Sequence, residues 1–269
     1  MITKNFAEIG GTKFYYEMAG NGPALVLVHA GIADGRMWED QFQAFAQQYR
    51  VLRYDRRGFG RTPMVAGAYS HHQDLYDLLT VLKIERAFFV GCSQGAKTVV
   101  DFTLEHPRMT SALVLVSPAL SGFAFAGEPP PQAQQLDAAD AAGDIELVNE
   151  LELQIWVDGP RRTPAQVDPT VRERVREMNL IALKTPEDLG DEQALEPAAV
   201  NRLDEIHAPT LVLTGEMDTP KTLAAVELLA RQIPGAKKVS IAGAAHVPNM
   251  EQVEAFNDHV LSFLGRLGE

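Results

Sequence analysis

The feature that most constrains the fold of this chain is an apolar run that breaks into a Gly-x-Ser-x-Gly motif. The run Ala87–Val90 is aromatic and β-branched, which predicts a buried strand, and the motif follows it at residues 91–95. The next residues continue at helical spacing until His106-Pro107, where the proline ends the helix. Strand, tight turn and helix in this order form a nucleophile elbow, in which flanking glycines leave the serine hydroxyl exposed. We therefore expect Ser93 to attack an acyl carbon.

Strand and helix patterns alternate along both halves of the chain, which predicts a parallel sheet with right-handed crossovers. The expected strands are Thr12–Met18 (antiparallel), Ala24–Val28, Val51–Tyr54, Ala87–Val90, Ala112–Val116, Thr210–Thr214 and Lys238–Ile241. Besides the helix after the motif, the expected helices are Trp38–Gln47, Gln73–Leu82, Thr222–Gln232 and Met250–Leu264.

Residues 121–200 interrupt this alternation, because they carry no strand signal. Two amphipathic helices are expected there, one over Asp144–Val157 and one that begins at Asp168-Pro169, with the aspartate as its N-cap. We therefore expect one core, made of residues 1–120 and 201–269, with a helical insertion over 121–200.

Composition limits the function classes. The 269 residues are 46% hydrophobic, which suits one sizeable core, and the formal net charge of −12 disfavours nucleic acid. Residues 121–200 hold 16 Asp and Glu against 6 Lys and Arg, so they carry −10 of that charge. No 18-residue apolar segment and no signal peptide is visible, so we expect a cytoplasmic protein without a membrane partner.

A single cysteine, Cys92, rules out an intramolecular disulfide and a multi-cysteine zinc site. Its place inside the motif predicts a buried structural thiol, with a cysteine nucleophile as the less favoured alternative. No metal and no cofactor are expected.

Serine catalysis needs a base that takes the hydroxyl proton and an acid that orients the base. Among seven histidines, His246 alone lies in a loop directly after a late strand and before the final helix. The acid is expected at Asp218, just beyond the strand that ends at Thr214, with Glu216 as the alternative. A carboxylate at either position could instead be a solvated helix cap.

An oxyanion hole requires backbone amides near the nucleophile. The loop after the strand Ala24–Val28 offers one such donor, for which we favour Gly31 over Ile32, and the amide of Gln94 is the second. The competing interpretation of Gly31 is a simple glycine turn.

Together these features resemble the α/β-hydrolase family over the whole chain. The matching motifs are His29-Ala30-Gly31 with Trp38 downstream, residues 55–62, the elbow, Gly215–Asp218, and Gly243–Phe256. The resemblance implies a mostly parallel eight-stranded sheet flanked by helices, with a helical cap inserted after strand six. Two departures are Ala30, where the family usually has glycine, and Gln94, which places a polar side chain beside the acyl pocket, within reach of the substrate or the insertion.

By the same resemblance the cap covers the nucleophile and shapes the substrate pocket. Candidate pocket residues are Ile32, Trp38, Phe123, Phe125, Trp156, Met178 and Val247. For any one of the cap residues, packing within the cap itself is the competing interpretation.

The function expected from these residues is a cofactor-free serine hydrolase acting on a small ester or lactone. The alternatives on the same three residues are a carbon–carbon bond hydrolase of ring-cleavage products and a perhydrolase. A ligand-binding receptor with slow or no turnover is the alternative of another class. The acidic insertion favours neutral esters over dianionic substrates.

Overall fold

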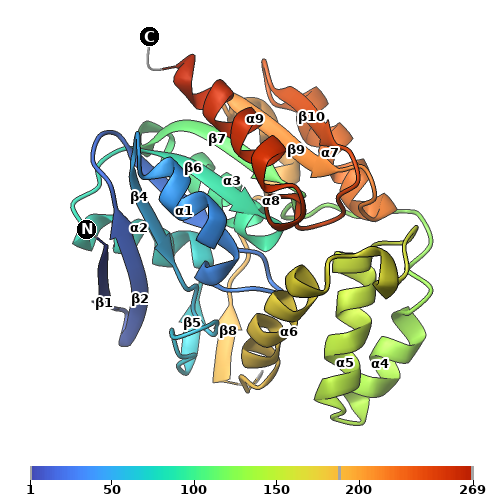
Figure 1. The fold of residues 1–269 in the computed structure, drawn as a ribbon. Helices are drawn as coiled ribbons and strands as arrows, with labels where there is room; N and C mark the ends of the chain where they lie inside the picture. Colours follow the sequence, from blue (N-terminus) through green and yellow to red (C-terminus); the bar gives the residue numbers. More distant parts are fainter. Residues whose placement is uncertain (1, 187–188, 268–269) are drawn as a thin grey trace.

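The sheet at the centre of this computed structural model, which describes residues 2–186 and 189–267, has eight strands in the order β1-β2-β4-β3-β6-β7-β9-β10 (Figure 1). β1 and β4 both pair antiparallel with β2, and every other pairing in the sheet is parallel. This confirms the expected α/β sheet. Its strands are β1 (Thr3–Ile9), β2 (Thr12–Ala19), β3 (Ala24–Val28), β4 (Arg50–Tyr54), β6 (Ala87–Cys92), β7 (Thr110–Val116), β9 (Thr210–Gly215) and β10 (Lys237–Ile241).

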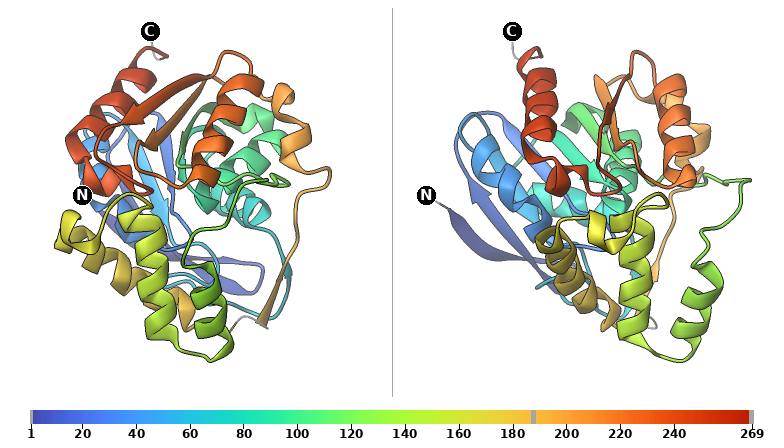
Figure 2. Two further views of the ribbon diagram at one scale, coloured as in Figure 1. Left: turned by 90° about the vertical axis from the view of Figure 1, so that its right-hand side faces the viewer. Right: turned by 45° about the vertical axis from the view of Figure 1, so that its right-hand side comes forward.

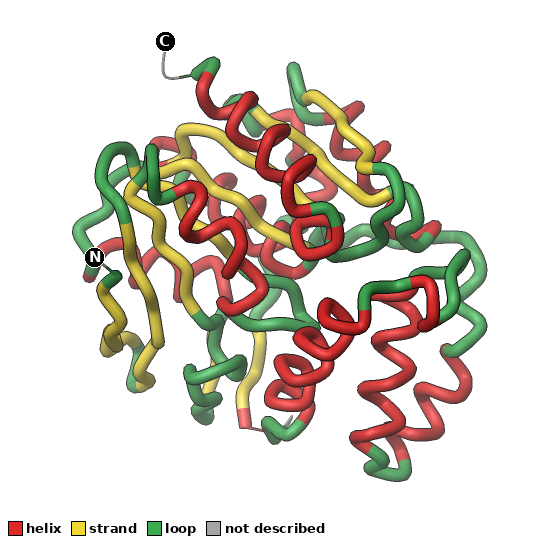
Figure 3. The backbone as a smooth tube through the Cα atoms, viewed as in Figure 1, coloured by secondary structure: helices red, strands yellow, loops and turns green. Residues whose placement is uncertain are grey.

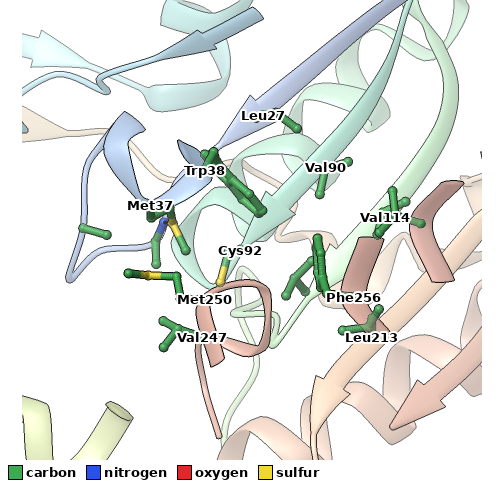
Figure 4. Close-up of a cluster of buried hydrophobic side chains, with 14 of the residues drawn as sticks. Leu27, Met37, Trp38, Val90, Cys92, Val114, Leu213, Val247, Met250 and Phe256 are labelled. Carbon is green, nitrogen blue, oxygen red and sulfur yellow. Dashed lines mark hydrogen bonds between the residues drawn. The ribbon is translucent and has the colours of Figure 1, made fainter. Parts of the chain in front are cut away.

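Helices cover both faces of the sheet (Figure 3). Alternate residues of β3 point to opposite faces, so Leu25 and Leu27 join one core cluster while Val26 and Val28 join the other. The first cluster includes residues of α1 (Glu39–Phe45), α8 (Pro248–Glu251) and α9 (Val253–Gly265). The second includes residues of α2 (His71–Val81), α3 (Gln94–Glu105) and α7 (Pro220–Gln232). Figure 4 shows part of the first cluster, with Trp38, Cys92 and Phe256 close together.

The segment between β7 and β9, here called the insertion, holds α4 (Ala133–Ala141), α5 (Ile145–Glu152), a π-helical turn (Leu153–Asp158) and α6 (Pro169–Leu183). These helices lie together beside one end of the sheet (Figure 2). The expected cap is present, because the Asp168 side chain accepts from the Thr170 amide, and the Asp144 side chain likewise accepts from the Leu147 amide at the start of α5. Short 3₁₀ helices span Gly35–Trp38, Pro107–Met109, Pro164–Gln166, Ala199–Asn201 and Leu203–Glu205.

Several expected elements differ from the structure. The insertion does contain a strand, because β8 (Gly190–Glu192) pairs with β5 (Gly67–Tyr69) in a separate two-stranded sheet. The sequence Gly-Asp-Glu has no strand pattern, so tertiary pairing alone creates β8. β1 and α4 were also not expected. The closing helix is broken at Gln252, whose φ of −134° is not helical, and Trp38 ends a 3₁₀ turn rather than starting α1.

None of the helices in the described part of the chain is long and apolar enough to cross a membrane.

Candidate active site

Ser93 occupies the turn between β6 and α3, with φ of +54° and ψ of −115°. A non-glycine residue rarely adopts a positive φ, so this backbone is strained in the manner of a nucleophile elbow. The two motif glycines make room for the turn. A Cβ on Gly91 would lie 2.5 Å from the Gly95 carbonyl oxygen, and a Cβ on Gly95 would lie 2.2 Å from the Val28 carbonyl oxygen. The sequence signature is therefore a steric requirement of the fold.

His246 and Asp218 meet in the loops that follow β10 and β9. His246 Nδ1 lies 3.0 Å from both carboxylate oxygens of Asp218, and both side chains are buried. The carboxylate also accepts from the Thr219 amide at 2.7 Å and from the Thr214 hydroxyl at 3.3 Å. Glu216, the alternative acid, is exposed to solvent. The structure thus brings Asp218, rather than Glu216, to the imidazole.

A cavity of about 230 Å³ lies beside Ser93 and His246. Ser93 and His246 both line it, together with Gln94, Phe123 and Trp156. Among the described residues, no hydrogen bond joins the Ser93 hydroxyl to His246. The cavity lies at the carboxyl ends of the parallel strands, where an open α/β sheet binds its ligands.

Two of the seven expected pocket residues, Phe123 and Trp156, line this cavity. The phenyl ring of Phe125 instead packs against Gly127. The remaining four side chains are buried in the first core cluster: Ile32, Trp38, Met178 and Val247. Their apolar character therefore serves packing, which periodicity alone cannot separate from a pocket wall.

The two expected oxyanion donors are the backbone amides of Gly31 and Gln94. Neither amide has a hydrogen-bond partner among the described residues, and Gln94 is the first residue of α3, whose N-terminal amides have no partner within the helix. The Gln94 side chain lies against Gly31, since a Cβ on Gly31 would be 2.6 Å from Gln94 Cδ. This close approach explains why glycine follows Ala30.

The insertion contacts His246 directly. The backbone N–H of His246 donates to the Trp156 carbonyl at 3.2 Å, and the two rings have centroids 4.6 Å apart. The Cys92 thiol donates to the His246 carbonyl at 3.7 Å. Burial raises the pKa of this thiol, which fits the structural role expected for Cys92.

Arg162 links the insertion to the His246 loop, a role that the sequence did not predict. Its guanidinium donates to the carbonyls of Val157, Asp158 and Gly243, and it pairs with Glu251 at 2.7 Å. The Glu251 carboxylate also accepts from the backbone N–H next to His246, that of Ala245, at 2.7 Å.

The loop after β4 supports the Gly31 segment. The Arg56 amide donates to His29 Nε2 at 2.9 Å, and His29 Nδ1 donates to the Ala30 carbonyl at 2.7 Å. Burial lowers the pKa of His29 to about 3, so this imidazole is neutral. Asp55 accepts from the amides of Gly35 and Arg61. For residues 55–62, which include this loop, the sequence indicated only a family resemblance. It predicted no role for Arg56.

Comparison with known proteins places these features in context. A family model described as the alpha/beta hydrolase fold matches residues 23–253. A pimeloyl-[acyl-carrier protein] methyl ester esterase of Vibrio atlanticus is 28% identical, covering 93% of this chain and 97% of the relative. 3-oxoadipate enol-lactonase 1 of Acinetobacter baylyi is 27% identical, covering 88% of this chain and 86% of the relative. The crystal structure of the enol-lactonase from Burkholderia xenovorans LB400 superposes with a TM-score of 0.77 at 28% identity, covering 97% of this chain and 99% of that one.

Proposed function

Because this chain belongs to the α/β-hydrolase fold family, we propose that it is a serine hydrolase that cleaves a small ester or lactone through an acyl-enzyme on Ser93. The observation that carries the proposal is the position of His246 between Asp218 and the cavity. Its Nδ1 faces the carboxylate at 3.0 Å, which fixes the proton there and leaves Nε2 as the basic nitrogen. Ser93 lines the same cavity as this imidazole.

The proposed reaction has two halves. In the first, Ser93 Oγ attacks the acyl carbon while His246 Nε2 takes its proton, and Asp218 stabilises the imidazolium. The amides of Gly31 and Gln94 donate to the oxyanion, and His246 then returns the proton to the departing alcohol oxygen. In the second half, His246 takes a proton from water, which attacks the acyl carbon; the bond to Ser93 Oγ then breaks, and His246 returns the proton to Oγ as the acid is released. A lactone is cleaved by the same steps, except that the departing alcohol oxygen stays attached to the acyl group through the opened ring.

Cavity size and lining support a small substrate. About 230 Å³ beside Ser93 suits a compact acyl group, and Leu120, Phe123 and Trp156 give the cavity apolar walls. The named relatives include an ester hydrolase and enol-lactonases, which supports these two substrate classes. A net charge of −12 supports a small-molecule substrate over a nucleic acid.

The test is covalent labelling with a fluorophosphonate probe, followed by mass spectrometry of the adduct and a p-nitrophenyl ester chain-length series. We expect the adduct on Ser93 and the fastest turnover with short acyl chains. Labelling of Ser93 together with weak ester turnover would instead favour a lactone substrate, a carbon–carbon bond hydrolase or a ligand-binding receptor. An intact protein that takes up no label at Ser93 would overturn the proposal.

A further inference from the structure

The Gln94 side chain sits between the nucleophile and the Gly31 loop. It lines the same cavity as Ser93, and it packs so closely on Gly31 that a Cβ there would lie 2.7 Å from Gln94 Nε2. Its carboxamide thus lies against Gly31, one of the two residues whose backbone amides the proposed function assigns to the oxyanion hole, and Gln94 itself is the other. Among the described residues, Gln94 Nε2 donates no hydrogen bond, whereas Oε1 accepts one.

Behind Gln94 lies Arg56, a buried cation at 1% exposure. Its Nη2 donates to Gln94 Oε1 at 3.2 Å, and its guanidinium stacks over the Phe59 ring at 4.4 Å. Within the described part of the chain, no carboxylate pairs with Arg56, and its Nε and Nη1 have no hydrogen-bond partner. By contrast, the adjacent Arg57 makes two hydrogen bonds to Asp74.

The Arg56 contact decides which way the carboxamide points. A guanidinium only donates hydrogen bonds, so the carboxamide oxygen must face Arg56 and the NH₂ group must be the free end. A positive charge behind the carbonyl also polarises the amide and makes its N–H groups stronger donors. The donor is therefore oriented and strengthened before any substrate arrives.

Arg56 acts through Gln94 and has no room to bind substrate itself. The cavity that Arg56 lines together with Gln94 is only about 10 Å³, which is room for about one water molecule. Through its backbone, the same residue holds His29, whose ring donates to Ala30, the neighbour of Gly31. One residue thus ties together both segments that carry the expected oxyanion donors.

We propose that the Gln94 side-chain amide is a third donor of the oxyanion hole, beside the backbone amides of Gly31 and Gln94, and that Arg56 is the residue that positions it. This inference rests on the proposed serine hydrolase function. Because the oxyanion exists only after attack on the acyl carbon, the side chain contributes to the transition state more than to substrate binding.

The first test replaces Gln94 with methionine, which keeps the length of the side chain and removes the donor. We expect kcat for a short p-nitrophenyl ester to fall by about 10- to 100-fold while KM stays within about twofold. The affinity for a trifluoromethyl ketone, which forms an oxyanion adduct with serine, should fall by a similar factor. Gln43→Met, at an exposed position of α1, is the matched control. An unchanged kcat in Gln94→Met, or a loss confined to KM, would overturn the assignment.

The second test separates positioning from packing by a double-mutant cycle. We expect Arg56→Met to lower kcat less than Gln94→Met, and the double variant to be no slower than Gln94→Met alone, because both changes disable the same donor. Arg56→Lys keeps the charge and should retain part of the activity. Melting temperatures confirm that each variant is folded. Fully additive losses would refute the positioning role of Arg56.

Wild-type labelling distinguishes this inference from the proposed function. Suppose that the probe labels Ser93 and the wild-type protein turns over esters. An unchanged kcat in Gln94→Met would then refute only the proposal of a third donor. If Ser93 in the intact protein takes no label, the oxyanion itself is absent and both proposals fail.

Discussion

Trp156 holds His246 in two ways: its carbonyl accepts from the His246 backbone N–H at 3.2 Å, and its indole lies 4.6 Å from the imidazole between ring centroids. Trp156 belongs to the π-helical turn Leu153–Asp158, an irregularity that is frequent at functional sites. The proposed base is therefore positioned by the insertion as well as by the loop after β10.

Replacing Trp156 with alanine should lower kcat for short esters by about tenfold, because the imidazole loses the surface that restricts its orientation. Trp156→Phe keeps an aromatic contact and should retain most of the activity. Steady-state kinetics with both variants checks this. Equal rates for the alanine and phenylalanine variants would show that the ring contact has no role in positioning His246.

Arg162→Ala should destabilise the protein by about 3 kcal/mol, because it leaves the buried Glu251 carboxylate without its cation. Three carbonyls, including that of Gly243 in the His246 loop, also lose their donor. Urea unfolding measures the loss, and Arg174→Ala, at a more exposed ion pair, is the control. Equal losses in the two variants would contradict the linking role of Arg162.

Ser93→Gly and Ser93→Ala should both abolish ester turnover and yet differ in stability. At a φ of +54° glycine is unstrained while alanine retains the strain, so the glycine variant should be more stable than the alanine variant by about 1 kcal/mol. Chemical denaturation of the two variants gives the difference directly. A more stable alanine variant would contradict the strain argument, and full activity in either would refute the nucleophile.

Gly95→Ala should cost at least about 3 kcal/mol or prevent folding, because the added Cβ would lie 2.2 Å from the Val28 carbonyl oxygen and 2.6 Å from that of His29. The control is Gly265→Ala at the end of α9, where a Cβ meets nothing within 4 Å. That variant should keep or slightly raise the melting temperature. Comparable melting temperatures for both would show that the elbow relaxes more easily than its geometry implies.

Asp101→Asn should stabilise the protein at alkaline pH. Burial raises the pKa of Asp101 from 3.8 to about 6, and Oδ1 has no partner among the described residues. Because the folded-state pKa lies above the unfolded value, the contribution of this carboxyl to stability falls as pH rises from about 4 through 6. Asparagine is neutral throughout and can still accept from the Ser121 hydroxyl.

The gain from Asp101→Asn should therefore be small at pH 4 and reach about 2 kcal/mol at pH 8. Urea unfolding at the two pH values measures it, with Asp258→Asn at an exposed helical position as the control. A gain that is independent of pH would show that the carboxyl is not the cause.

The local sequence pattern was sufficient to predict those features that depend only on the neighbouring backbone. The elbow, the apolar run of β3 and the Asp168 cap each follow from spacing and residue type over a short window. Pattern failed for β8, because Gly-Asp-Glu becomes a strand only by pairing with β5. It also could not separate Trp156, at the cavity, from Trp38, which is fully buried in the core.

The sequence by itself determined seven of the eight strands of the main sheet, the helices that alternate with them and the place of Ser93, because hydrophobic periodicity and glycine sterics act between residues close in the chain. Tertiary structure decided which acid faces His246, that Trp156 and Arg162 hold the His246 loop, and that Arg56 orients Gln94. These contacts join residues 28 to 90 positions apart. Their geometry depends on how the sheet and the insertion pack, and no local pattern encodes that packing.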